Sequence, residues 1–175
     1  MKRRAAECAA DMLKRVRIQI VSERCEMVGD LFSGKPLLPR SGAEWQRMEM
    51  MSEARYHDNG TRVSIFYKEG APTGLEGSEA RISYHKAEPN AVVMQRTGSV
   101  KTELIFEPGM RHECVYRTPI MPFEVCVHTE RVENSLDTEG VLRLDYIVQL
   151  KGADPERTKM TLTLLPDYDA PQGIR

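Results

Sequence analysis

The sequence predicts an all-β protein, an antiparallel up-and-down β-barrel of roughly eight to ten strands. Three observations predict it. From Val100 to Phe106, apolar and polar side chains alternate, which is typical of a strand with one face in a core and one in water. Similar segments precede and follow this one, separated by short turns. No convincing helix lies between them, so consecutive strands should be antiparallel neighbours, and closing the sheet would remove its exposed edges.

Length and composition indicate one globular domain. The chain has 175 residues, of which 41% are apolar and 29% charged, and a chain of this length buries roughly 70% of its unfolded surface. We assign residues 14–166 to a single barrel domain. Residues 1–13 are expected to form an N-terminal tail or short helix, and residues 167–175 a C-terminal tail.

Charge and hydropathy argue against several classes of partner. Lys and Arg number 25 against 26 Asp and Glu, a net charge of −1, so no global field draws the chain to nucleic acid or to an anionic membrane. No window approaches the ~20 apolar residues that a membrane span needs. Glu7 and Asp11 interrupt the N-terminal apolar run, unlike a secretory leader. The expected location is cytoplasmic, with no membrane partner.

The first convincing strand covers residues 15–22, with Val16, Ile18 and Ile20 on one face. Glycines and prolines then break the rhythm over 26–43, which predicts an inserted loop. The apolar side chains of this loop are Leu31, Phe32, Leu37 and Leu38. Either the loop folds back over the sheet, or these side chains meet a protein partner.

The second strand, 45–57, should pair with the first. Asp58-Asn59-Gly60 follows it and is the strongest hairpin signal in the chain, because Asn-Gly accepts the positive φ of a type I′ turn. Arginines and glutamates interleave on the polar faces of these two strands, which predicts cross-strand ion pairs. The remaining strands are expected at 61–68, 80–86, 91–96, 100–106, 111–117, 123–132, 141–150 and 159–165.

Four motifs then occur in a fixed order. They are Thr73-Gly74-Leu75-Glu76-Gly77, Arg96-Thr97-Gly98-Ser99-Val100, Phe106-Glu107-Pro108-Gly109-Met110-Arg111-His112 and Tyr116-Arg117-Thr118-Pro119. Their order and spacing resemble the bacterial DUF1934 family, also called the YwiB-like proteins, over about residues 60–165. The resemblance implies a calycin-like, lipocalin-like β-barrel of uncharacterised function and no assigned chemistry.

Five polar side chains are the candidate ligand-binding residues: Arg96, Glu107, Arg111, His112 and Tyr116. Strand alternation places Arg96 on the same face as Val92 and Met94, and the question is whether this face points into the barrel. A buried charge there needs a carboxylate or a bound anion, and Glu103 and Glu107 are the expected internal partners. His112 beside an acid and a tyrosine could transfer a proton, although turn-stabilising hydrogen bonds account for the same residues.

No metal or cofactor is expected. The four cysteines, Cys8, Cys25, Cys114 and Cys126, are far apart and form no Cys-x-x-Cys pair, so free thiols are expected. The methionines of the second strand, among them Met48 and Met50, either line an adaptable cavity or fill the core.

Three functional hypotheses follow. The leading one is a non-enzymatic barrel that binds one small apolar or amphipathic ligand in its lumen. The first alternative is a barrel filled with side chains that acts as a protein- or RNA-interaction module, with the 26–43 loop as a contact. The second alternative is an enzyme that uses His112 and Tyr116. The oligomeric state is left open.

Overall fold

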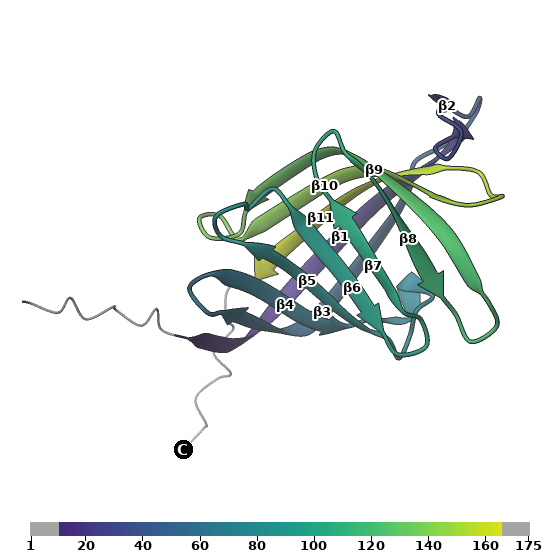
Figure 1. Ribbon diagram of the computed structural model, residues 1–175. Coiled ribbons are helices and arrows are strands. Elements are labelled where there is room, and N and C mark those ends of the chain that lie inside the picture. The colour runs from purple at the N-terminus through teal and green to yellow at the C-terminus, as the bar shows by residue number, and fades with distance from the viewer. Residues whose placement is uncertain (1–10, 166–175) are drawn as a thin grey trace, which may run out of the picture.

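The structure, a computed structural model, describes residues 11–165, and its strands form one antiparallel meander (Figure 1). Ten strands make the wall, in the order β7-β6-β5-β4-β3-β1-β11-β10-β9-β8, and β2 pairs only with β1. The strands are β1 (Met12–Asp30), β2 (Lys35–Pro39), β3 (Gln46–Asp58), β4 (Arg62–Lys68), β5 (Glu79–His85), β6 (Val92–Thr97), β7 (Thr102–Phe106), β8 (Arg111–Arg117), β9 (Pro122–Ser135), β10 (Val141–Leu150) and β11 (Glu156–Leu165). One 3-10 turn, η1 (Ala71–Thr73), follows β4. The prediction of an all-β, up-and-down barrel is confirmed.

The two edge strands, β7 and β8, meet at one end of the seam. Lys101 N donates to Arg117 O (2.9 Å), and Arg117 N donates to Lys101 O (2.8 Å). At the other end, the turn after β7 is tied to β9, because Gly109 N donates to Thr129 O (2.8 Å). The wall is therefore nearly closed, and the pairing of β1 with β3 and β11 completes it on the far side.

Side chains that alternate inward fill the middle of the barrel. The Phe106 and Tyr146 rings pack against each other with centroids 4.7 Å apart and an interplanar angle of 54°. Burying each large apolar side chain contributes roughly 1.5–3 kcal/mol. The largest side chains with less than 2% of their surface exposed include Ile18, Ile65, Ile82, Met94, Phe106, Leu142, Leu144 and Leu162.

The predicted loop over 26–43 is wrong for much of its length. Residues 26–30 continue β1, and Lys35–Pro39 forms β2, which pairs back onto β1. Glycines and prolines suggested a loop, yet Gly29, at φ +124°, is compatible with a bulge in the β1–β2 register. A Cβ at Gly29 would lie 2.3 Å from Pro36 O, so the hairpin needs glycine there.

The β1–β2 hairpin folds onto the outer face of β9 and β10. A second apolar cluster lies there, and it consists of Met27, Leu31, Cys126 and Ile147, with Phe32 and Leu37 packed against it. The Leu31 backbone is held on both sides: its N–H donates to Gln149 Oε1 (2.6 Å), and its carbonyl accepts from Arg111 Nη1. Leu38 instead is 60% exposed. One of the two expected outcomes for this segment, folding back over the sheet, is thus observed for Leu31.

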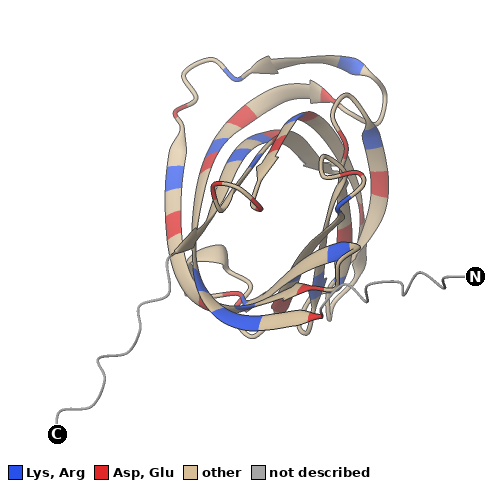
Figure 2. Cartoon of the chain, turned by 90° about the vertical axis from the view of Figure 1, so that its left-hand side faces the viewer, with Lys and Arg blue, Asp and Glu red and all other residues tan. Residues whose placement is uncertain are grey.

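The other strand predictions agree with the structure to within a few residues. The expected N-terminal tail or helix lies mostly outside the described residues, although Met12 and Leu13 belong to β1, and the C-terminal tail lies outside them altogether. Acidic and basic positions are interspersed around the wall (Figure 2). Within residues 11–165 there is no helix long and apolar enough to cross a lipid bilayer.

Candidate functional site

The structure separates the five candidate residues into three places. Arg96 and Tyr116 lie at the end of the barrel where β6 and β8 finish. Glu107 and His112 lie at the opposite end, where β7 finishes and β8 begins. Arg111 is on the outside, bound to the β1–β2 hairpin. The five residues therefore do not form one site.

Arg96 makes an ion pair with Glu69. Its Nε donates to Glu69 Oε1 at 2.9 Å, and 18% of the Arg96 side chain is exposed against 1% of Glu69. Arg96 shares the inner face with Val92 and Met94, as alternation indicated, but the expected partners Glu103 and Glu107 were wrong. Glu103 accepts from Gln95 (2.6 Å), and Glu107 lies at the other end of the barrel.

Glu69 could have been found by extending the alternation of β4. Val63, Ile65 and Tyr67 are all buried on its inner face, and Glu69 is the next residue of the same parity. The predicted strand ends at residue 68, so it leaves out Glu69 and the buried carboxylate that Glu69 provides. The chain turns into η1 directly after it.

Arg96 stays charged because of Glu69, and the tyrosines near Arg96 stay neutral. Burial acts to lower the pKa of Arg96, but the charge of Glu69 outweighs it, so the pKa of Arg96 is raised and the guanidinium stays charged. Burial and the negative charge of Glu69 both raise the pKa of Tyr67. Burial likewise raises the pKa of Tyr146, although Arg96 opposes it. Neutral tyrosines therefore surround a charged pair.

Apolar side chains continue from this pair toward the barrel end. Arg96 lies opposite Thr102 on β7, and Thr102 Oγ1 is 3.9 Å from Cys114 Sγ on β8. Cys114, Tyr116 and Val148 are half-buried and pack against the core. Burial raises the pKa of Cys114, so its thiol stays protonated and behaves as a small apolar group.

His112 and Tyr116 are not placed for joint proton transfer. They sit four residues apart on β8, about 13 Å along the strand. His112 Nε2 is 3.3 Å from Glu107 Oε1 but is not directed at it in hydrogen-bonding geometry, and this nitrogen is buried without a hydrogen bond to described residues. The structure thus offers a His–Glu contact at one end and a tyrosine at the other.

The β9–β10 turn covers the end of the barrel where β4 begins and β5 finishes. Leu136 in this turn is buried, and Tyr84 Oη donates to Asp137 Oδ1 at 3.2 Å. Burial and the charge of Asp137 raise the pKa of Tyr56 to about 12, so Tyr56 is neutral at pH 7. The sequence predicts no strand between residues 132 and 141 and gives no sign of these contacts with β3 and β5, because they form only in the closed barrel.

Two hollows lie outside the lumen. The larger, about 850 Å³, is a groove on the outer face of β1, β3, β4 and β5. The smaller, about 410 Å³, lies between the β1–β2 hairpin and the outer face of β9, β10 and β11. Within residues 11–165, no group of three or more His, Cys, Asp or Glu side chains is arranged to hold a metal ion, and Cys25, Cys114 and Cys126 are free thiols.

Comparison with known proteins now decides the family. The sequence model of the family described as "Domain of unknown function (DUF1934)" matches residues 39–162, more than half of the chain. The chain belongs to the DUF1934 family. Among solved structures, this DUF1934 chain is similar to one described as the crystal structure of ywiB protein from Bacillus subtilis. The TM-score is 0.59 at 15% identity, covering 88% of this chain and 96% of the other.

The resemblance noted from the sequence is therefore confirmed. At 15% identity, the ywiB similarity establishes that the two proteins share a fold and nothing more. A search of curated proteins found no match. The DUF1934 barrel thus has an established family and architecture, and its activity has to be argued from its own side chains.

Proposed function

We propose that this DUF1934 protein is a non-enzymatic barrel that binds one small amphipathic anion, at the end of its interior where Arg96 lies. One observation supports this most directly. The Arg96 side chain uses only its Nε to pair with Glu69, and its two terminal amino groups have no hydrogen-bond partner among residues 11–165. Because only one of its N–H groups is used by Glu69, the Arg96 guanidinium can still donate its other N–H groups to a carboxylate or phosphate.

The neighbouring side chains suit the apolar part of such a ligand. Tyr116 is half-buried two residues from Cys114 on β8, and Val148 of β10 is half-buried against the same core. An alkyl chain resting on them would bury apolar surface worth about 25 cal/mol per Å². Because Phe106, Met94 and Ile82 fill the middle of the barrel, the ligand would occupy one end of the lumen rather than its full length.

Calorimetric titration with sodium decanoate tests this proposal. We expect saturable 1:1 binding by the intact chain and at least a tenfold loss of affinity in Arg96→Gln. Glu69→Gln should bind decanoate more tightly, because it leaves Arg96 without its internal anion. Arg143→Gln is the matched control, since Arg143 is an exposed arginine on the outer face of β10.

1-Decanol, which has the same chain length and no charge, separates the head group from the tail. We expect decanol to bind much more weakly than decanoate. Equal affinity for both, or equal decanoate affinity in Arg96→Gln and Arg143→Gln, would rule out anion recognition by Arg96. Absence of any saturable binding would rule out the whole proposal.

A second candidate function is favoured by the filled interior. In this proposal the barrel is a scaffold, and the β1–β2 hairpin contacts a protein partner through Leu38, which is 60% exposed beside a docked segment. Leu38→Asp should then abolish recovery of a partner in a pull-down without changing the melting temperature. Recovery of the same proteins by the intact chain and by Leu38→Asp would argue against it.

A further inference from the structure

A row of side chains crosses the outer face of four neighbouring strands. Arg15 of β1 lies directly opposite Arg55 of β3, Arg55 opposite Phe66 of β4, and Phe66 opposite Arg81 of β5. Like charges directly opposite each other on a sheet are destabilising. The Arg15–Arg55 pairing is therefore tolerated at a cost that a bound anion would remove.

Phe66 holds the two arginines beside it. The Cζ atoms of Arg55 and Arg81 lie 5.3 Å and 5.4 Å from the centroid of its half-buried ring. Both distances are within the range of cation–π attraction. Arg81 is fixed further because its Nη2 donates to Ser64 Oγ at 3.2 Å, while its Nε is buried without a hydrogen-bond partner among described residues. The guanidinium groups are thus partly ordered before any ligand arrives.

The ion pairs predicted between β1 and β3 are observed, within residues 11–165, at Arg47 only. Arg47 contacts Glu23 of the neighbouring strand (3.8 Å) and Glu49 of its own strand (3.6 Å). Within residues 11–165, no ion pair shorter than 4.0 Å includes Arg55 or Arg81. Their positive charges are therefore not neutralised by a neighbouring carboxylate of the described barrel wall.

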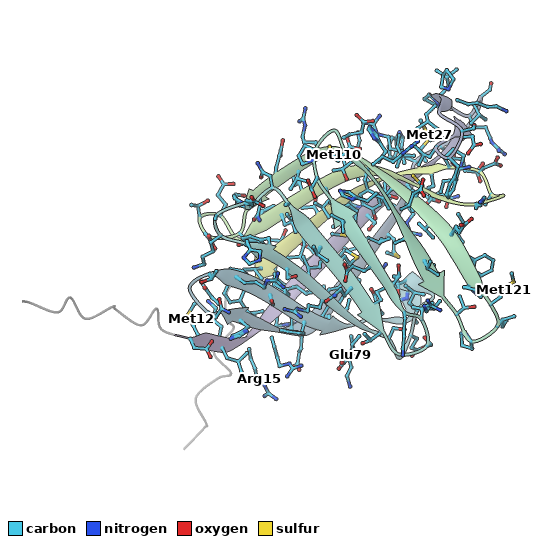
Figure 3. All side chains as sticks on the ribbon, viewed as in Figure 1. Met12, Arg15, Met27, Glu79, Met110 and Met121 are labelled. Carbon is cyan, nitrogen blue, oxygen red and sulfur yellow. The ribbon has the colours of Figure 1, made fainter. Side chains whose placement is uncertain are left out.

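Arg15, Arg55 and Phe66 border the larger hollow, and Arg81 lies beside it, directly opposite Phe66. The groove of about 850 Å³ is lined by Arg15, Arg17, Arg55, Phe66 and Lys68, together with the carboxylates Glu53 and Glu79. Arg15 and Glu79 point away from the barrel on the same side of the molecule (Figure 3). The register sets Glu53 opposite Arg17 and Glu79 opposite Lys68. Arg15, Arg55 and Arg81 have no acidic residue opposite them in these pairings.

We propose that this groove binds a small molecule that carries two or more phosphate groups. Guanidinium groups match phosphate oxygens in a bidentate fork, and Arg15 and Arg81 are three strand spacings apart, roughly 14 Å. The volume is typical of a small-molecule site. A long polyanion fits less well, because the whole chain carries a net charge of −1 and two glutamates line the groove. This site is separate from the interior end at Arg96.

Titration with sodium tripolyphosphate, at ionic strength matched with sodium chloride, tests the assignment. We expect saturable 1:1 binding and at least a tenfold loss of affinity in Arg55→Gln and in Arg81→Gln. Phe66→Leu should weaken binding as well, because it removes the ring that orders both guanidinium groups. Arg55→Lys should lose less than Arg55→Gln, since it keeps the charge but not the planar fork. Arg143→Gln should bind like the intact chain.

Three results would overturn the proposal. One is no saturation at matched ionic strength. The second is equal affinity in Arg55→Gln, Arg81→Gln and Arg143→Gln, which would mean that tripolyphosphate binds elsewhere. The third is tighter binding of a single-stranded RNA 12-mer that the same two substitutions abolish, which would assign the groove to a long polyanion instead. The melting temperature of each variant establishes that it is folded.

Discussion

At the scale of single residues, the interior ion pair has the largest energetic consequence. Taking Glu69 and Arg96 out of water costs several kcal/mol per ion, and their attraction offsets this only in good geometry. The 2.9 Å contact supplies that geometry. Losing one partner leaves the other charged and buried, whereas losing both removes the cost as well.

We therefore expect Arg96→Met to destabilise the fold by about 3–5 kcal/mol. The double variant Glu69→Leu/Arg96→Met should recover most of this loss, because it leaves no unpaired charge. Urea unfolding of the intact chain, both single variants and the double variant measures the coupling. If the double variant were as unstable as the sum of the two single variants, the charges would not interact.

Asp58 and Lys86 form a second ion pair at the opposite end, with Lys86 Nζ 2.5 Å from Asp58 Oδ2. Burial acts to raise the pKa of Asp58, but the hydrogen bonds from Lys86 and from the Gly60 N–H outweigh it, so the pKa lies below its ordinary value of 3.8. A carboxyl group with a lowered pKa stabilises the fold above its unfolded pKa, and this contribution is lost as the pH falls through the folded pKa.

Asp58→Asn should lower the melting temperature at pH 7, and the difference from the intact chain should shrink as the pH falls below about 4. Asparagine keeps an oxygen for the Gly60 N–H, so the substitution chiefly removes the charge. Thermal melts between pH 7 and pH 3 measure this, with Lys86→Gln expected to behave alike. A difference that stays constant with pH would show that the charge does not stabilise the fold.

Alternation in the sequence predicts which side chains face the interior, but it does not predict the polar contacts that they make there. Alternation alone placed Arg96 on the same face as Val92 and Met94, which the structure confirms. It could not identify Glu69 as the partner, because that carboxylate lies 27 positions earlier and is brought near only by the β4–β5–β6 pairing. Periodicity reports which way a side chain points, not what it meets.

At the scale of elements, the β1–β2 hairpin is where sequence and structure differ most. Gly29, Gly34 and the prolines of 26–43 have the composition of a loop, and the register that turns them into a strand depends on packing against β9 and β10. The apolar side chains at 31, 32 and 37 were the better signal. They indicated burial, and they are buried or half-buried against the barrel wall.

Gly29→Ala should destabilise this hairpin specifically. A Cβ there meets Pro36 O at 2.3 Å and forces a side chain onto φ +124°, so the hairpin must open or shift. Hydrogen exchange should quicken at Leu31 and Leu38 and stay unchanged at Ile18. Gly34→Ala is the matched control: its φ is +72°, but no atom lies within 4 Å of the added Cβ. Equal effects of both substitutions would contradict the role of the close contact.

At the scale of the whole molecule, the sequence predicted the barrel but not whether side chains fill its interior. Alternation and short turns predict a meander. Closing the sheet covers its exposed edge strands, so β7 and β8 were expected to lie side by side. Whether ten strands enclose a hollow depends on side-chain volumes summed across the barrel. Here Phe106, Tyr146 and Met94 fill the middle and leave accessible surface at the Arg96 end.

Two-dimensional ¹H–¹⁵N NMR during titration with sodium decanoate is the most direct measurement of whether that end binds an amphipathic anion. The largest and saturable shifts are predicted at Arg96, Thr102, Cys114, Tyr116 and Val148, with little change at Leu136 and at Arg55. Shifts confined to the β1–β2 hairpin or to the outer groove, or no saturable shift at all, would contradict a ligand site inside the barrel.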